Sequence, residues 1–370
     1  MQRLHVRDPA ADLLVGLLVD PDASRGLALE DWDRVVRVGR ASRLLAALRR
    51  RLEDAGALAA VPAPVRGHLD SEAAAARYRK QMVLRELHEL AGALDSAAAP
   101  LVLVKGAAYV VQRLRVADAR VVSDVDLLVP VARLDAIETR LVEAGWQPVD
   151  VDPYDDRYYR EWSHEVPPMR YPGHALELDL HHAILPPISR VRADPAPLFA
   201  GSRPVAGTTF RVLAPEDQIA HACVHTFVDS DLADRLRDVV DLDGLLREFA
   251  EQPGFWGRLC ARAAELGLGR GVWYGLHYAE RLVGTPVPES VWTRMAAHAP
   301  GAAVCALMDW LVASAAPPLP LEQPASLAVR IARWLATVRY FWLRMPLPIL
   351  LRHAAVKGYR RLFPRSASAS

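Results

Sequence analysis

The sequence predicts an α+β protein, with a small mixed β-sheet core flanked by an N-terminal helical region and a C-terminal helical bundle. Three observations predict this class. Leucine and valine recur at three- and four-residue spacing up to residue 98, as on the apolar face of a helix. Between residues 99 and 214, short apolar and alternating runs typical of strands appear, separated by glycine and proline. From residue 215 the helical spacing returns.

The bulk composition argues against several classes of protein. The chain has 370 residues, enough for two or three domains, and its formal net charge of +1 gives no general reason to expect a nucleic-acid partner. Its three scattered cysteines show neither disulfide nor metal-ligand spacing, so we expect a cytoplasmic protein. No uncharged apolar stretch reaches the length of about 18 residues that a membrane span needs, so we expect no transmembrane segment.

The N-terminal region, residues 1–98, is expected to be helical. Residues 32–54 and 71–98 carry the helical pattern, and Pro62 and Pro64 separate them. Because the region contains no cluster of catalytic residue types, we interpret it as a helical cap or packing domain.

Residues 99–214 are expected to form the α/β core. Strands are predicted at residues 101–104, 121–129 and 175–184, within 158–166, and at the short edge segment 210–213. Helices are predicted at residues 107–115 and 131–145. This order predicts a small mixed sheet and not a long series of βαβ units.

Residues 215–316 are expected to form a helical bundle, which begins with an acidic first turn at Glu216 and Asp217. Further helices are predicted at residues 232–250, 255–266, 272–282, 290–298 and 303–313. Residues 317–370 form a basic amphipathic tail that is rich in aromatic residues. The tail can make weak contact with an anionic membrane surface, contact an acidic partner, or pack its tryptophans against the bundle, and we favour packing.

Two aspartates form the strongest candidate site. Side chains at i and i+2 of a strand point to the same face, so Asp124 and Asp126 are expected side by side, about 7 Å apart. Their charges repel unless a cation neutralises them, and such oxygen ligands suit Mg²⁺ or Mn²⁺, of which Mg²⁺ also binds substrate phosphates. The alternative is a solvated pair on an exposed strand edge. Lys105, one of three lysines in the chain, lies in the turn before the pair and suits a phosphate.

A later strand offers a third carboxylate. Glu177, Asp179 and His181 alternate onto one face. If this strand lies beside the aspartate pair, Asp179 approaches it, with Glu177 as the competing choice. Three carboxylates can hold two metal ions about 4 Å apart, the arrangement that clamps the attacking and leaving oxygens of a phosphoryl transfer. The alternative is an ordinary amphipathic strand with a solvated acidic face.

Other candidates carry less weight. His221 and His225 have the i, i+4 spacing that can chelate a transition metal on a helix, but we favour packing or polar contacts for them. The charged run at residues 235–241 is interpreted as a solvated or salt-bridged helix face.

The chain resembles the uncharacterised nucleotidyltransferase-like family of the polymerase-beta-type nucleotidyltransferase superfamily, over roughly residues 20–250. The matching string is Lys105-Gly106, then Arg120, then Ser123-Asp124-Val125-Asp126, then Asp179-Leu180-His181. The superfamily pattern is a strand, a glycine turn, a short helix, a paired-carboxylate strand and a third carboxylate on a later strand. This family has lysine–glycine where other members have glycine–serine.

The resemblance implies a nucleotidyltransferase core at residues 99–214 and a role for each matching residue. It implies that Asp124, Asp126 and Asp179 coordinate Mg²⁺ bound to a nucleoside triphosphate such as ATP. For the phosphates, Lys105 and Arg120 would supply charge, Gly106 would let the backbone approach closely, and Ser123 would supply a hydroxyl. His181 would be a further contact to the nucleotide.

The function expected from the resemblance is Mg²⁺-dependent transfer of a nucleoside monophosphate from a triphosphate to a hydroxyl-type acceptor, with release of pyrophosphate. The alternative is a catalytically degenerate module of the same fold that binds a nucleotide or a partner. Neither the acceptor nor the base follows from the residues.

Overall fold

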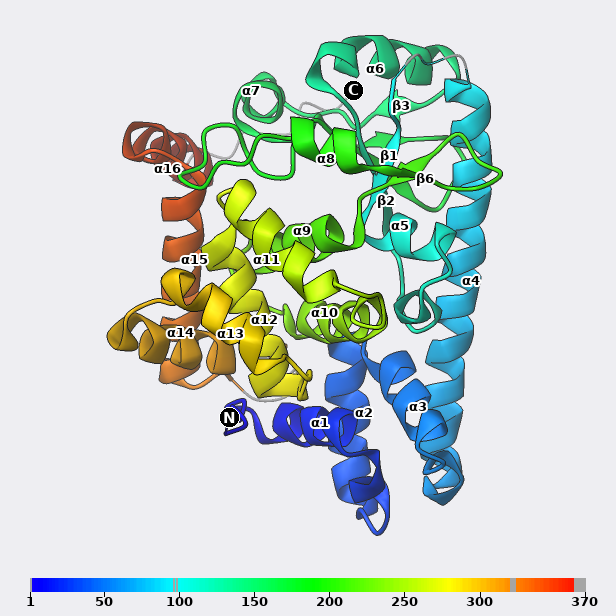
Figure 1. Ribbon diagram of the computed structural model, residues 1–370, viewed down its shortest axis with the longest axis vertical. Helices are drawn as coiled ribbons and strands as arrows, with labels where there is room; N and C mark the ends of the chain where they lie inside the picture. Colours follow the sequence, from blue (N-terminus) through cyan, green and yellow to red (C-terminus); the bar gives the residue numbers. More distant parts are fainter. Residues whose placement is uncertain (1, 96, 98, 320–323, 363–370) are drawn as a thin grey trace.

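The structure, a computed structural model, describes residues 2–95, 97, 99–319 and 324–362. The predicted α+β class is confirmed, because helices at both ends of the chain flank a seven-stranded mixed sheet (Figure 1). Buried apolar side chains form one connected cluster that extends from Val6 to Ala336. The N-terminal helices, the sheet and the C-terminal bundle therefore share one core.

Four α-helices and two short 3₁₀ helices make up the N-terminal region. They are α1 (Pro9–Val19), η1 (Pro21–Ser24), α2 (Leu29–Ala41), α3 (Leu45–Asp54), η2 (Leu58–Ala60) and α4 (Ala63–Leu94). The helical pattern at residues 32–54 is divided between α2 and α3, because Arg43 adopts a left-handed backbone conformation with φ of 56°. Pro64 lies in the first turn of α4, where a missing N–H costs nothing.

The 32-residue helix α4 connects the two halves of the molecule. It contacts α2 and α3 near its start, and α5, α6 and β2 farther along. In Figure 1 it runs vertically from the N-terminal helices to the level of the sheet.

The sheet has the strand order β3-β4-β5-β2-β1-β7-β6. The strands are β1 (Val102–Val104), β2 (Asp124–Leu128), β3 (Gln147–Pro148), β4 (Met169–Arg170), β5 (Glu177–His181), β6 (Arg203–Pro204) and β7 (Arg211–Val212). At its centre β2 pairs antiparallel with β1 and parallel with β5. Two strands far apart in the sequence therefore become neighbours.

The connections within the core are mostly short helices. They are α5 (Lys105–Val111), η3 (Arg115–Asp118), η4 (Val131–Arg133), α6 (Leu134–Glu143), α7 (Pro153–Trp162) and α8 (Ala196–Gly201). The strand predicted within residues 158–166 is wrong for most of that segment, which belongs to α7, and only Glu165 pairs with β5, as an isolated bridge. The Asp152 side chain accepts hydrogen bonds from two backbone N–H groups at the start of α7, and Pro153 opens its first turn.

The C-terminal part is a helical bundle followed by two further helices. They are α9 (Pro215–Phe227), α10 (Leu236–Phe249), α11 (Phe255–Glu265), α12 (Gly269–Val283), α13 (Glu289–Met295), η5 (Ala296–His298), α14 (Ala302–Ala315), α15 (Leu327–Arg344) and α16 (Leu347–Leu362). Helix α15 buries Ala332 and Ala336, but the predicted packing of the tail's tryptophans is wrong, since Trp334 and Trp342 have exposed fractions of 63% and 49%.

Within the described residues, no single helix combines the length and apolar composition needed to cross a membrane. Two consecutive helical segments, Glu289–His298 and Ala302–Ala315, meet both criteria only when taken together, and the chain bends by 108° between them.

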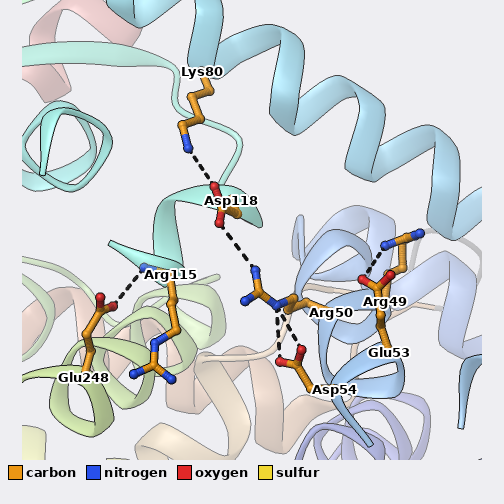
Figure 2. Close-up of polar contacts among 8 residues, drawn as sticks. All are labelled: Arg49, Arg50, Glu53, Asp54, Lys80, Arg115, Asp118 and Glu248. Atoms are coloured by element: carbon orange, nitrogen blue, oxygen red, sulfur yellow. Dashed lines mark hydrogen bonds and ion pairs between the residues drawn. The ribbon is translucent and has the colours of Figure 1, made fainter. Parts of the chain in front are cut away.

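Polar contacts join the N-terminal helices to the core, and the core to the bundle. Figure 2 shows Asp118 of η3 between Lys80 of α4, at 2.6 Å, and Arg50 of α3, at 3.4 Å. The backbone N–H of Arg115 donates to Glu248 of α10 at 2.8 Å (Figure 2). These contacts lie where α3, η3 and α10 meet.

Candidate functional site

Two strands bring four acidic side chains to one face of the sheet. In the register of β2 and β5, Asp124 lies opposite Glu177 and Asp126 lies opposite Asp179. Paired residues on neighbouring strands share a face, as do residues two apart on one strand. The alternation expected from the sequence is therefore present, and the sheet pairing brings the two acidic pairs together.

Asp126 lies at the centre of this group and is only 1% exposed. Its Oδ1 accepts a hydrogen bond from Lys105 Nζ at 2.7 Å and lies 3.0 Å from His181 Nε2. Its Oδ2 is buried and has no hydrogen-bond partner. Burial alone would raise the pKa of Asp126, but the charge of Lys105 and the contact with His181 hold this pKa well below its usual range.

Lys105 reaches Asp126 from a strained backbone. It follows β1 directly and has φ of 50°, in the left-handed region that few residues other than glycine adopt. Burial lowers the pKa of its ammonium, but the charge of Asp126 more than compensates, and the net pKa lies above its ordinary value. A strained conformation that places a charge in an acidic site indicates a functional constraint.

Asp179 and His181 complete a group of ligand atoms. A carboxylate oxygen from Asp126, another from Asp179 and a ring nitrogen of His181 lie within 4.8 Å of one another. Burial and the charge of Asp126 raise the pKa of Asp179 to about 7. Glu177, the competing choice for the third carboxylate, forms an ion pair with Arg170 instead.

Asp124 is partly buried beside this group. Burial and the charge of Asp126 raise its pKa above the ordinary value. Ser123 Oγ donates a hydrogen bond to its Oδ2 at 3.2 Å. Ser123 itself is exposed, whereas Asp124 is partly buried.

Gly106 and Arg120 make contacts that sequence reasoning did not anticipate. A Cβ on Gly106 would lie 2.9 Å from Val122 Cγ1, so the glycine permits close packing of α5 against the segment that precedes β2. Arg120 forms an ion pair with Asp241 of α10, and Arg237 lies 3.6 Å from the same carboxylate. The charged run at residues 235–241 is therefore salt-bridged in part to the core.

A small cavity of about 30 Å³ adjoins Lys105, between α5 and the helices α9 and α10. Its lining includes Lys105, Tyr109, Arg120, His225, Asp238 and Asp241. Burial lowers the pKa of His221 to about 3, and burial together with Lys105 lowers that of His225, so both imidazoles are neutral near pH 7. Neither histidine belongs to a group of three metal-ligating side chains in the described parts of the chain.

Sequence reasoning missed His164 and Glu165. Together with His181 they form a second group whose ligand atoms lie within 4.8 Å of one another. The His164 and His181 rings stack with centroids 5.2 Å apart. The adjacent histidine and glutamate could have indicated a pair of metal ligands. They were overlooked because residues 158–166 were predicted to contain a strand.

The acidic group has the chemistry of a hard-cation site. Its donors are carboxylate oxygens, one of them buried and unpartnered, and such donors fit Mg²⁺ or Mn²⁺. A buried acceptor without a partner costs free energy that a bound cation would recover.

Comparison with known proteins gives one match. No curated protein and no solved structure matches the chain significantly. A family model described as uncharacterised nucleotidyltransferase matches residues 28–284, which run from the beginning of α2 to the end of α12. The matched segment includes β2, β5 and every acidic residue of the site. The chain therefore belongs to the uncharacterised nucleotidyltransferase family.

Proposed function

We propose that this protein is an Mg²⁺-dependent nucleotidyltransferase, which moves a nucleoside monophosphate from a triphosphate such as ATP to a hydroxyl-type acceptor and releases pyrophosphate. One observation carries the proposal. Carboxylate oxygens of Asp126 and Asp179 belong to a group of ligand atoms within 4.8 Å of one another, and Asp124 lies on the same sheet face in a chain of this family. This geometry suits cations that bind a triphosphate.

In the proposed reaction, Asp124, Asp126 and Asp179 hold Mg²⁺, which neutralises phosphate charge when bound. The acceptor oxygen forms a bond to the α-phosphorus as the bond from that phosphorus to the bridging oxygen breaks, and pyrophosphate leaves with the electron pair. Asp179, on the strand beside Asp126, would accept the acceptor's proton directly or activate the hydroxyl through the metal.

The remaining residues would bind and orient the triphosphate. Lys105 beside Asp126 and Arg120 beside Asp241 would supply positive charge for the phosphates. Ser123 presents an exposed hydroxyl beside Asp124, and His181 holds Asp126 in position. Positioning and charge are the principal contributions that phosphoryl-type transfers need from a protein.

One observation favours a second candidate function, a nucleotide- or partner-binding module without transfer. Lys105 already neutralises Asp126 from within the chain, at 2.7 Å. If this ion pair persists in the presence of a triphosphate, the internal cation takes the place of a metal and the site binds without turnover.

The test combines a transfer assay and a binding assay on the full chain. Triphosphates labelled at the α- or γ-phosphate are incubated with Mg²⁺ or Mn²⁺ and a panel of alcohols, sugar phosphates, peptides and RNA, with water and the protein itself as further acceptors. We expect transfer of the α-label with release of pyrophosphate. Asp126→Asn is expected to reduce this transfer by about 10²–10³-fold, because the charge that holds the metal is lost.

Glu177→Gln is the matched control, because Glu177 lies on the same strand face but is paired with Arg170. This variant is expected to keep transfer close to the wild-type rate, whereas Asp179→Asn loses it. Transfer of the γ-label would indicate a phosphotransferase instead. Calorimetric binding of Mg-ATP without transfer to any acceptor would favour the binding module, and full activity of Asp126→Asn would remove the proposed site.

A further inference from the structure

We propose that His164, Glu165 and His181 form a second metal site, which takes a transition-metal ion such as Zn²⁺ beside the acidic group. Ligand atoms of the three side chains lie within 4.8 Å of one another. The proposal does not depend on nucleotidyl transfer, because it concerns which ion these three side chains bind.

Backbone pairing holds the three ligands in place. Glu165 and His181 form an antiparallel bridge, so their side chains lie on the same face. On either side of the bridge, the N–H of His182 donates to the carbonyl of His164 at 2.9 Å, and the N–H of Val166 donates to the carbonyl of Leu180 at 3.1 Å. Both ligand-bearing segments are therefore fixed before any ion binds, as a precise metal site requires.

The two ring nitrogens of His181 face different partners. Nε2 lies 3.0 Å from Asp126 Oδ1, at hydrogen-bond distance, and Nδ1 lies 3.6 Å from Glu165 Oε2. If Nε2 carries the proton and donates a hydrogen bond to Asp126, the lone pair of Nδ1 is directed toward Glu165. A carboxylate that receives the other N–H of a metal-bound histidine is the usual partner that orients such a ligand.

The 3.6 Å separation of His181 Nδ1 and Glu165 Oε2 also suits a shared ion. It is too long for a hydrogen bond. Two ligands that each bind Zn²⁺ at about 2.0–2.2 Å in tetrahedral geometry stand roughly 3.4 Å apart. A small movement would bring both atoms to one ion.

His164 supplies an independent observation. It is 5% exposed, and its Nδ1 has no hydrogen-bond partner. Its Nε2 lies 3.7 Å from Asp229 Oδ2, also beyond hydrogen-bond distance. A buried imidazole with an unpartnered nitrogen costs free energy, and an ion bound with Glu165 and His181 would recover it.

The donor set distinguishes this site from the acidic group. Two imidazoles and one carboxylate suit Zn²⁺ and similar transition-metal ions, whereas Mg²⁺ prefers oxygen ligands only. Three protein ligands also leave one position of a tetrahedral ion open to water or to an oxygen of a bound molecule.

The experiment measures binding of the metal alone to the full chain. Protein treated with a chelator is titrated with Zn²⁺ by calorimetry and with Co²⁺ by visible absorption, which reports tetrahedral coordination. With excess Mg²⁺ present to compete at the acidic group, we expect one Zn²⁺ per chain, with an affinity that falls on the order of 100-fold or more in His164→Asn and in Glu165→Gln. Glu165 is partly exposed, so its variant is expected to keep the fold even if the variant at buried His164 does not.

His182→Asn is the matched control, because His182 is the sequence neighbour of His181 but belongs to neither group of ligands. It is expected to bind Zn²⁺ like the wild type, and excess Mg²⁺ is expected to leave the bound Zn²⁺ in place. The proposal is overturned if the chain binds no Zn²⁺, if Glu165→Gln binds it as tightly as the wild type, or if Mg²⁺ displaces it from a single shared site.

Discussion

At the scale of single residues, two adjacent carboxylates have opposite protonation behaviour. Asp126 and Asp179 lie opposite each other on β2 and β5. Lys105 and His181 hold the pKa of Asp126 low, while burial and the charge of Asp126 raise that of Asp179 to about 7. Near neutral pH and without metal, Asp179 is therefore present in both its protonated and its ionised form. A divalent cation would displace the proton from Asp179.

This difference predicts a pH-dependent effect of Asp179→Asn on stability. Because the folded-state pKa of Asp179 is raised, its contribution is fully present below about pH 4 and is lost as pH rises through about 7. Each pKa unit corresponds to about 1.4 kcal/mol. Allowing for partial exposure, we expect Asp179→Asn to raise the free energy of unfolding by on the order of 2 kcal/mol at pH 8 without metal.

Urea denaturation at pH 5 and pH 8, with and without Mg²⁺, measures this effect. The advantage of the variant is expected to be smaller at pH 5, and Mg²⁺ at pH 8 is expected to stabilise the wild type more than the variant. An advantage that does not change with pH would contradict the raised pKa of Asp179.

The sequence predicts only those placements of side chains that depend on local geometry. Alternation along one strand is enough to place Asp124 beside Asp126, and Asp179 beside Glu177. The choice between Asp179 and Glu177 depends on Arg170, and the partner of Arg120 is Asp241, more than a hundred residues away. Such contacts come from the tertiary fold, and no periodicity in one sequence reveals them.

At the scale of elements, the strands β1, β2, β5 and β7 lie within the segments predicted as strands, whereas β3, β4 and β6 were not predicted. The prediction failed at α7, where tyrosines and a tryptophan suggested a strand. Asp152 at the N-cap, together with ion pairs from Arg157 to Glu161 and from Asp156 to Arg160, stabilises a helix there. Strands of two residues, such as β3 and β6, are too short to leave a pattern in the sequence.

Close packing between α9 and α12 predicts the effect of a single methyl group. A Cβ on Gly275 of α12 would lie 2.1 Å from Cys223 Sγ of α9. Gly275→Ala is expected to lower the free energy of unfolding by about 1–3 kcal/mol, because either the helices or the cysteine must move. Gly67→Ala in α4 is the matched control, since nothing lies within 4 Å of its added Cβ.

Gly67→Ala is expected to stabilise the protein by about 0.5–1 kcal/mol, the usual gain on replacing an exposed helical glycine. Urea denaturation of both variants gives the comparison. Equal stabilities for the two variants would show that α9 and α12 are not packed as closely as the structure indicates.

At the scale of the whole molecule, the N-terminal helices and the bundle meet at a buried carboxylate. The Asp243 side chain on α10 is fully buried and forms ion pairs with Arg51 of α3 and Arg247. Its Oδ1 also accepts a hydrogen bond from Thr285 Oγ1 at 2.7 Å. The domain limits expected from the sequence are 1–98, 99–214, 215–316 and 317–370. They stay a prediction, and the regions they separate share one core.

Asp243→Ala is predicted to destabilise the whole chain by about 3 kcal/mol, because it leaves two arginines without their buried partner. Asp118→Ala, which removes the exposed carboxylate in Figure 2, is expected to cost no more than about 1 kcal/mol. Thermal unfolding followed by circular dichroism and by tryptophan fluorescence is expected to give one coincident transition in both variants. A separate early transition in Asp243→Ala would show that the N-terminal helices unfold on their own.

The continuity of α4 restricts how the molecule can move. At about 1.5 Å per residue, its 32 residues form a rod of roughly 48 Å. One end of this rod is packed among the N-terminal helices and the other against β2. A rotation of those helices relative to β2 would have to bend the rod, so we expect the N-terminal helices and β2 to move together.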